Sequence, residues 1–242
     1  TAIVTGGANG IGREIVEQFA TQGATVVVAD VEDGPEFGND LDERVHPVET
    51  DVTDEAAVAD LAETALAEFG SIDVLVNNAA VYSPLVTERD RGFDEIPLDE
   101  WRSVIDVNLT GVYICCREIA PCVADTGGGS VVNIASAVAF FGATGYPHYV
   151  ASKGALVPLT RSLARELGGE GVRVNAIAPG LILSEASQQL SEEYIESVVD
   201  LQCIDRPGRP EDVVDTVEYL AGERSSFITG STLHVDGGQT LR

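Results

Sequence analysis

"TGGANGIG", residues 5–12, lies between the apolar run at 2–5 and a helical pattern that extends to about residue 21. Glycine lets the chain turn sharply, and it lets backbone N–H groups approach a pyrophosphate that the start of the following helix also attracts. A glycine cluster alone is weak evidence. Here a strand comes before it, a helix comes after it, and Asp30 ends the next apolar run, "TVVVAD" at 25–30. The stretch therefore predicts a dinucleotide-binding turn, with Asp30 accepting hydrogen bonds from the adenosine ribose.

Asp30 also favours NAD over NADP as the cofactor. Its charge would repel the extra phosphate of NADP, and no Arg or Lys stands in the loop before Gly10 or just after Asp30 to offset it. We interpret Arg13, inside the first helical turn, as a surface residue or one behind the site. The alternative is that Asp30 is one more acid among 40 Asp and Glu, but it follows three valines and an alanine directly.

Short apolar runs alternate with helical patterns along the whole chain. The apolar runs are 2–6, 25–30, 45–51, 72–80, 130–136, 172–180 and 231–238, and the longer helical patterns are 54–70, 98–124 and 149–168. Continuous apolar runs indicate strands buried on both faces, and this alternation predicts an α/β fold with a parallel sheet between two layers of helices. Neither a linker nor an internal repeat is visible, so we expect a single domain over 1–242. Ligands bind such sheets outside the carboxyl ends of the strands.

The composition is strongly acidic, with a formal net charge of −26 from 40 Asp and Glu against 14 Lys and Arg. This charge argues against partners such as nucleic acid and anionic membranes, which need a basic surface. With only one lysine in the chain, the acid excess favours a halophilic source over an ordinary acidic surface.

The sequence has no apolar run long enough for a membrane span and no signal peptide, so we expect a cytoplasmic protein. Its cysteines and histidines have no metal-ligand spacing.

Five motifs occur in an order that resembles the short-chain dehydrogenase/reductase family. They are T-G-x-x-x-G-x-G at 5–12, "NNAA" at 77–80, Ser136, "YVASK" at 149–153 and "PG" at 179–180. The resemblance covers essentially the whole chain and is greatest to members similar to 3-oxoacyl-acyl-carrier-protein reductases. It implies a Rossmann-type, doubly wound fold with a seven-stranded parallel sheet and helices on both faces. It also implies a homotetramer or a dimer.

The resemblance implies a catalytic tetrad of Asn108, Ser136, Tyr149 and Lys153, and all four residues are present. Tyr149 and Lys153 are four residues apart at the start of a predicted helix, so their side chains point the same way. An isolated tyrosine has a pKa of about 10 and is a poor base at neutral pH, but a neighbouring ammonium favours its phenolate. In this scheme Tyr149 exchanges a proton with the substrate hydroxyl, and Ser136 hydrogen-bonds the substrate oxygen.

The other two roles also come from the resemblance. Lys153 would bond the nicotinamide ribose, and Asn108 would interrupt its helix and anchor a water that links Lys153 to solvent. Singly, each residue has a structural alternative: Tyr149 as an amphipathic interface residue, Ser136 as a cap and Asn108 as a satisfied core amide. The expected cofactor contacts are Gly6, Asn9, Gly10, Ile11, Gly12, Asp30, Val31, Asp51, Val52, Asn78, Ala79, Tyr149, Lys153, Pro179, Gly180, Ile182 and Ser184.

Two segments should shape the substrate pocket. They are the apolar stretch 137–145, with Phe140 and Phe141 either as walls or as plain core residues, and a lid around 185–210 with Leu190, Tyr194, Val198 and Leu201 on its apolar side. The charged segment 82–100 is expected to be a surface loop, at the pocket rim or at a subunit contact. Tyr146 is interpreted as a pocket or packing residue and His148 as incidental.

We expect a small-molecule substrate and an NAD-dependent oxidoreductase that transfers hydride between the cofactor and a secondary alcohol or ketone, either a 3-hydroxyacyl or 3-oxoacyl compound or a small alcohol. The alternatives are a sugar or polyol dehydrogenase of the same family and a non-catalytic NAD-binding regulatory protein.

Overall fold

In the described part of the computed structural model, seven strands form one parallel sheet in the order β3-β2-β1-β4-β5-β6-β7. The model describes the chain except residues 33–36, 39–40, 42, 82–90, 185–189 and 242. The strands are β1 (Ala2–Thr5), β2 (Val26–Asp30), β3 (Val45–Glu49), β4 (Val74–Asn77), β5 (Gly129–Ile134), β6 (Val172–Pro179) and β7 (Thr232–Val235). Each overlaps a predicted apolar run, and the expected Rossmann-type sheet is confirmed.

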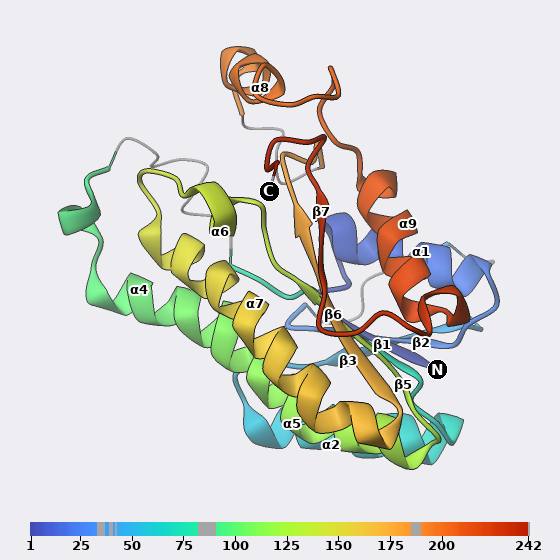
Figure 1. The fold of residues 1–242 in the computed structure, drawn as a ribbon. Helices are drawn as coiled ribbons and strands as arrows, with labels where there is room; N and C mark the ends of the chain where they lie inside the picture. The colour runs from blue at the N-terminus through green and yellow to red at the C-terminus, as the bar shows by residue number, and fades with distance from the viewer. Residues whose placement is uncertain (33–36, 39–40, 42, 82–90, 185–189, 242) are drawn as a thin grey trace.

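Helices cover both faces of this sheet (Figure 1). They are α1 (Gly10–Thr21), α2 (Glu55–Phe69), α4 (Leu98–Ile105), α5 (Val112–Asp125), α6 (Val138–Phe141), α7 (Pro147–Leu167), α8 (Glu192–Val199) and α9 (Pro210–Ala221). Helices α1 and α9 pack together on one face, while α2, α5 and α7 cover the other. Helix α8 stands apart, beyond the carboxyl ends of the strands (Figure 1). Short 3-10 turns are η1 (Phe93–Glu95), η3 (Gly168–Glu170) and η5 (Glu223–Ser225).

The valines of β2 show why the sheet is buried on both sides. Successive strand residues point to opposite faces, so Val27 and Ala29 join the core under α2 and α5, while Val26 and Val28 join the core under α1 and α9. All four are at most 1% exposed. An apolar residue at every position thus serves two cores at once.

The predicted long helix at 98–124 is present as three consecutive segments. Helix α4 passes into the π-helical segment η2 (Asp106–Gly111), which passes into α5. The expected interruption at Asn108 therefore occurs without a break in direction (Figure 1). A π segment inserts one extra residue in a helix and is frequent at functional sites.

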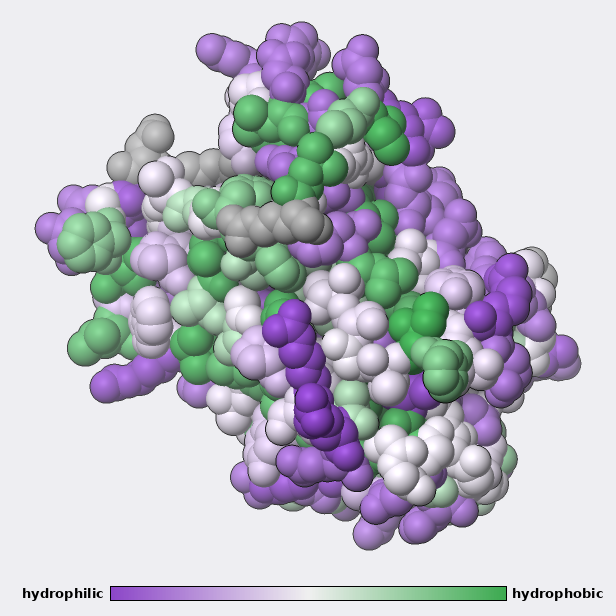
Figure 2. Space-filling model, viewed as in Figure 1, coloured by the Kyte–Doolittle hydropathy of each residue, from purple (hydrophilic) through white to green (hydrophobic). Residues whose placement is uncertain are grey.

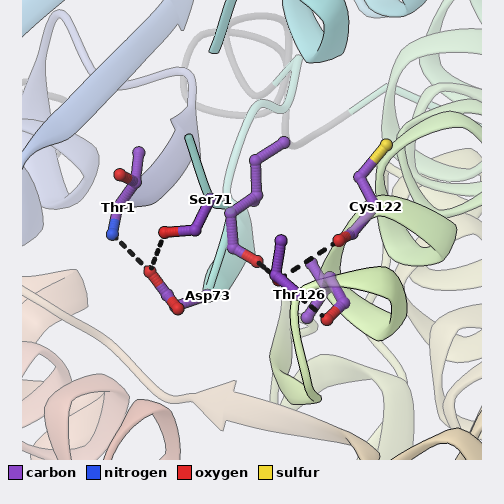
Figure 3. Close-up of polar contacts among 7 residues, drawn as sticks. Thr1, Ser71, Asp73, Cys122 and Thr126 are labelled. Atoms are coloured by element: carbon purple, nitrogen blue, oxygen red, sulfur yellow. Dashed lines mark hydrogen bonds and ion pairs between the residues drawn. The ribbon is translucent and has the colours of Figure 1, made fainter. Parts of the chain in front are cut away.

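The amino-terminal edge of the sheet is held by short polar contacts (Figure 3). The Ser71 hydroxyl donates to the Asp73 carboxylate at 3.1 Å, and the Thr126 hydroxyl lies 3.0 Å from the carbonyl oxygen of Ile72 and 3.2 Å from that of Cys122. These contacts join the loop before β4 to the end of α5. They lie at the edge opposite the carboxyl ends, where a ligand site is expected.

Candidate active site

The turn after β1 is built so tightly that it requires glycine. Gly6 has φ +63°, and a Cβ on Gly6 would lie 2.6 Å from the Cα of Ala79. A Cβ on Gly12 would lie 2.0 Å from the Gly6 carbonyl oxygen. The Asn78 amide donates to that same carbonyl oxygen at 2.8 Å and fixes the turn from β4. The result is a compact turn at the start of α1, where backbone N–H groups can approach an anion such as a pyrophosphate.

Asp30 ends β2 directly beside this turn. One carboxylate oxygen accepts a hydrogen bond from the Ala8 N–H at 2.9 Å, and the other accepts from the Glu32 N–H at 3.2 Å. A carboxylate has about four lone-pair sites, so these two bonds orient Asp30 and leave it able to accept more. Asp30 lines the cavity beside the glycine turn.

Tyr149 and Lys153 lie on the first two turns of α7 and face the same cavity. The Lys153 ammonium is 5.9 Å from the centre of the Tyr149 ring and donates to the Ile134 carbonyl oxygen at 2.7 Å. Burial lowers the pKa of Lys153 to about 8, because the folded protein solvates the ammonium poorly. Ser136 follows β5 and also lines the cavity. Three of the four predicted catalytic residues are therefore brought together.

The fourth, Asn108, lies behind the cavity and does not line it. It is fully buried in η2, where its side-chain oxygen accepts from the Val81 N–H at 2.7 Å. Its amide nitrogen is 3.3 Å from the Val81 carbonyl oxygen and from the Ser152 hydroxyl. Asn108 thus joins the chain after β4 to the helix that carries Tyr149. These contacts are those of a satisfied core amide and do not test the expected water path.

One cavity of about 1120 Å³ joins the glycine turn to Tyr149 and Lys153. The predicted cofactor contacts that line it are Gly6, Asn9, Gly10, Ile11, Gly12, Asp30, Val31, Asp51, Val52, Asn78, Ala79, Tyr149, Lys153, Pro179, Gly180, Ile182 and Ser184. Lining residues outside the predicted motifs and segments include Val81, Val107 and Gln239. Val81 follows the motif at 77–80, Val107 precedes Asn108 in η2 and Gln239 follows β7, so only their position next to predicted residues pointed to them.

Apolar side chains form the part of the cavity beyond Tyr149. Tyr146 packs edge-on against Tyr149, with 6.2 Å between ring centres, and both belong to a small buried cluster with Val104. Tyr194 and Val198 of α8 also line the cavity, as does Leu201 just after it. Figure 2 shows apolar surface between the polar outer end of α8 and the body of the molecule. A parallel β-bridge between Ile182 and Gly208 joins the chain after β6 to the chain just before α9.

Phe140, His148 and Leu190 do not have the first roles expected of them near the pocket. Phe141 lines the cavity. Phe140 does not line it and packs on the His234 ring, with 4.3 Å between the two ring centres. The two side chains diverge because they lie on the short helix α6, where neighbouring residues point to different sides. His148 is not incidental: it is fully buried and bonded to Glu100. Leu190 is not among the lining residues. Residues 82–90 and 185–189 of the predicted loop and lid lie outside the described residues.

A doubly wound parallel sheet with a glycine turn and a cavity at its carboxyl edge defines a Rossmann-type protein. Comparison with known proteins places it further. A family model described as enoyl-(acyl carrier protein) reductase matches residues 6–240. A crystal structure from Brucella melitensis, described as a short-chain dehydrogenase/reductase of the glucose/ribitol dehydrogenase type, matches with TM-score 0.87 and 30% identity. That match covers 100% of this chain and 96% of the other. The chain belongs to the short-chain dehydrogenase/reductase family.

Curated relatives match over nearly their full length. The 3-oxoacyl-acyl-carrier-protein reductase FabG of Thermotoga maritima is 34% identical over 99% of this chain and 97% of the relative. A cis-4-hydroxycyclohexanecarboxylate dehydrogenase from Sinomonas cyclohexanicum is 38% identical over 99% and 96%. The chain is thus a nicotinamide-dependent oxidoreductase that acts on CH–OH groups. Among the described residues, none of the helices has the length and apolar character needed to cross a membrane.

Proposed function

We propose that the protein interconverts a secondary alcohol and a ketone with NAD, and that Tyr149 is the general acid/base. The observation that carries the proposal is the single cavity that has the glycine turn and Asp30 in one part and Ser136, Tyr149 and Lys153 in another. A dinucleotide extended through it would bring its reactive end to these three side chains. An oxidoreductase needs such side chains beside the reactive end of its cofactor, whereas a protein that only binds the cofactor does not need them.

The residues present fit a nicotinamide dinucleotide. The tight turn at Gly6 and Gly12 accepts the pyrophosphate, and Asp30 accepts from the ribose hydroxyls. Ile182 and Ser184 also line the cavity. When bound, the cofactor supplies the hydride acceptor or donor. NAD is favoured over NADP, since the chain from Val31 to Glu43 contains no Arg or Lys beside Asp30.

In this proposal the protein's own groups handle the proton. Lys153 is a buried ammonium below pH 8, and it faces Tyr149 from one helical turn away, so its charge favours the phenolate form. The phenolate removes the proton from the substrate hydroxyl during oxidation, and the phenol returns it during reduction. The Ser136 hydroxyl hydrogen-bonds the substrate oxygen and stabilises its developing charge.

The substrate we propose is a small, uncharged, largely apolar alcohol or ketone. Beyond Tyr149 the cavity is lined by Val138, Phe141, Tyr146 and Val198, and Lys153 is the single cation among the described lining residues. Apolar walls of this kind favour a hydrocarbon body over a polyol. Helix α8, with its apolar side toward the cavity, would serve as the lid over this substrate.

Replacement of Tyr149 by phenylalanine tests the mechanism. Tyr149→Phe keeps the ring and removes the hydroxyl, so we expect kcat to fall by about 100-fold or more, because general acid/base catalysis contributes on the order of 10²–10⁴-fold. The dissociation constant for NAD should change little. Oxidation of cyclohexanol, sorbitol and a 3-hydroxybutyryl thioester, followed as NADH absorbance, measures the effect and compares the substrate classes.

Tyr113→Phe is the matched control, since Tyr113 lies on α5 and is 48% exposed. It makes the same chemical change and should leave kcat unaltered. Full turnover in Tyr149→Phe would show that the proton is handled elsewhere. Tight NAD binding by the wild type without turnover of any alcohol or ketone would favour the non-catalytic alternative.

A further inference from the structure

Helix α7 carries a second polar face beside the one that holds Tyr149 and Lys153. His148 and Ser152 are four residues apart, so they share a side of the helix. Both are fully buried, and neither lines the cavity. They face α4 and η2, which run beside α7 (Figure 1). Tyr149 and Lys153 are thus each preceded directly by a buried residue that contacts an element packed beside α7.

The tie at His148 is a charged hydrogen bond inside the protein. Its Nε2 lies 3.0 Å from the Oε1 of Glu100 on α4. Arg91 pairs with the same carboxylate, and the hydrogen bond from Arg91 holds the pKa of Glu100 below its usual range. Glu100 is therefore an anion at neutral pH, and Nε2 of His148 is the atom that donates. The Trp101 ring stacks on the imidazole, with 6.4 Å between ring centres.

Side-chain bonds to both neighbouring elements hold the first turn of α7. Its N-cap residue, Tyr146, makes no side-chain capping bond, and the N–H groups of Tyr149 and Val150 share one acceptor, the Tyr146 carbonyl oxygen, at 3.1 and 3.2 Å. The Ser152 hydroxyl, which is joined to η2 through Asn108, donates to the Tyr149 carbonyl oxygen at 2.8 Å. The bond from His148 to Glu100 joins the same turn to α4. Helix ends open more easily than helix centres, so the bond to α4 bears on the position of Tyr149.

We infer that His148 is a positioning residue for the reaction, and that its hydrogen bond to Glu100 fixes the first turn of α7 so that the Tyr149 hydroxyl is held at the reacting oxygen. The inference rests on the proposed function, because it takes Tyr149 as the acid/base. His148 does not touch the cavity, so it acts through the turn. Catalysis is sensitive to such placement, since a misplacement of about 1 Å can lower a rate about 100-fold.

Three variants test the inference by turnover. His148→Leu removes the donor and should lower kcat for the best alcohol substrate by about 10- to 100-fold, with the dissociation constant for NAD within about twofold of wild type. His148→Gln keeps an N–H donor toward Glu100 and should retain kcat within about threefold. Asp99→Asn, at the exposed neighbour of Glu100, is the control for loss of charge on α4 and should leave kcat unchanged. Equal kcat in the Leu and Gln variants would overturn the role of the hydrogen bond.

Amide hydrogen exchange on the NAD-bound protein tests the same inference without turnover. The amides of Tyr149 and Val150 report on the first turn. We expect their exchange to become about tenfold faster in His148→Leu and in Glu100→Leu, which lacks an acceptor, and to stay at the wild-type rate in Asp99→Asn. Glu100 is partly exposed, so its Leu variant keeps the test open if His148→Leu fails to fold. Unchanged exchange in Glu100→Leu would overturn the inference. Absence of turnover in the wild type would instead count against the proposed function.

Discussion

At the scale of single residues, Lys153 couples the candidate site to the stability of the fold. Burial lowers its pKa from 10.5 to about 8. Between these two values the unfolded chain holds a proton that the folded chain does not, so the free energy of unfolding must rise as the pH rises. The expected gain without cofactor is about 3 kcal/mol from pH 8 to pH 10.5. Below pH 8 both states hold the proton, and the cost of burying the ammonium is constant.

Urea unfolding of the wild type and of Lys153→Met across this pH range measures the effect. Tyrosines and thiols titrate in the same range, so the difference between the two curves isolates the lysine. If the free energy of unfolding rises with pH equally in both proteins, the predicted contribution of Lys153 is contradicted.

The sequence identified Lys153 as the only lysine and as the partner of Tyr149, but it did not show the bond to Ile134 or the role of His148. Both depend on which elements pack against α7, and residue spacing along the chain does not contain that information.

At the scale of elements, the carboxyl end of β2 determines the cofactor in our proposal. We expect the wild type to prefer NAD over NADP, and Asp30→Asn to reduce that preference by about tenfold or more, since hydrogen bonds to a charged group contribute about 1.5–3 kcal/mol. The Asn variant keeps an oxygen that can accept from the Ala8 N–H, so the turn stays in place. The ratio of kcat/KM for NAD to that for NADP is the measurement.

Glu32→Gln is the control, because it makes the same charge change at an exposed position two residues further on. Equal kcat/KM for the two cofactors in the wild type would refute the role given to Asp30.

Elements with strong patterns, such as β2 and α2, were predictable from the sequence alone. Helix α9 was not among the predictions, although Pro210 at its start and Val213, Val217 and Leu220 at helical spacing carried the signal.

At the scale of the whole molecule, the net charge of −26 is the property that the fold does not explain. Several described ion pairs join arginines to acids, as Arg117 joins Glu55 and Arg206 joins Asp212, but acids outnumber cations too far for pairing to neutralise them. The remaining carboxylates repel one another, and this repulsion is stronger in the compact folded state than in the extended chain. The halophilic source that the composition favours stays a prediction.

Salt should therefore stabilise the protein by screening this repulsion. Raising KCl from about 0.05 M to about 1 M shortens the Debye length from over 10 Å to about 3 Å. We expect the melting temperature to rise by on the order of 5 °C, equivalent to about 2 kcal/mol for a chain of this size. A variant with amides at four exposed acids, Asp60→Asn, Glu63→Gln, Glu68→Gln and Glu170→Gln, should show a smaller rise. Calorimetry of both proteins without cofactor makes the comparison. If the two rises are equal, salt acts through preferential exclusion from the surface and not through the carboxylates.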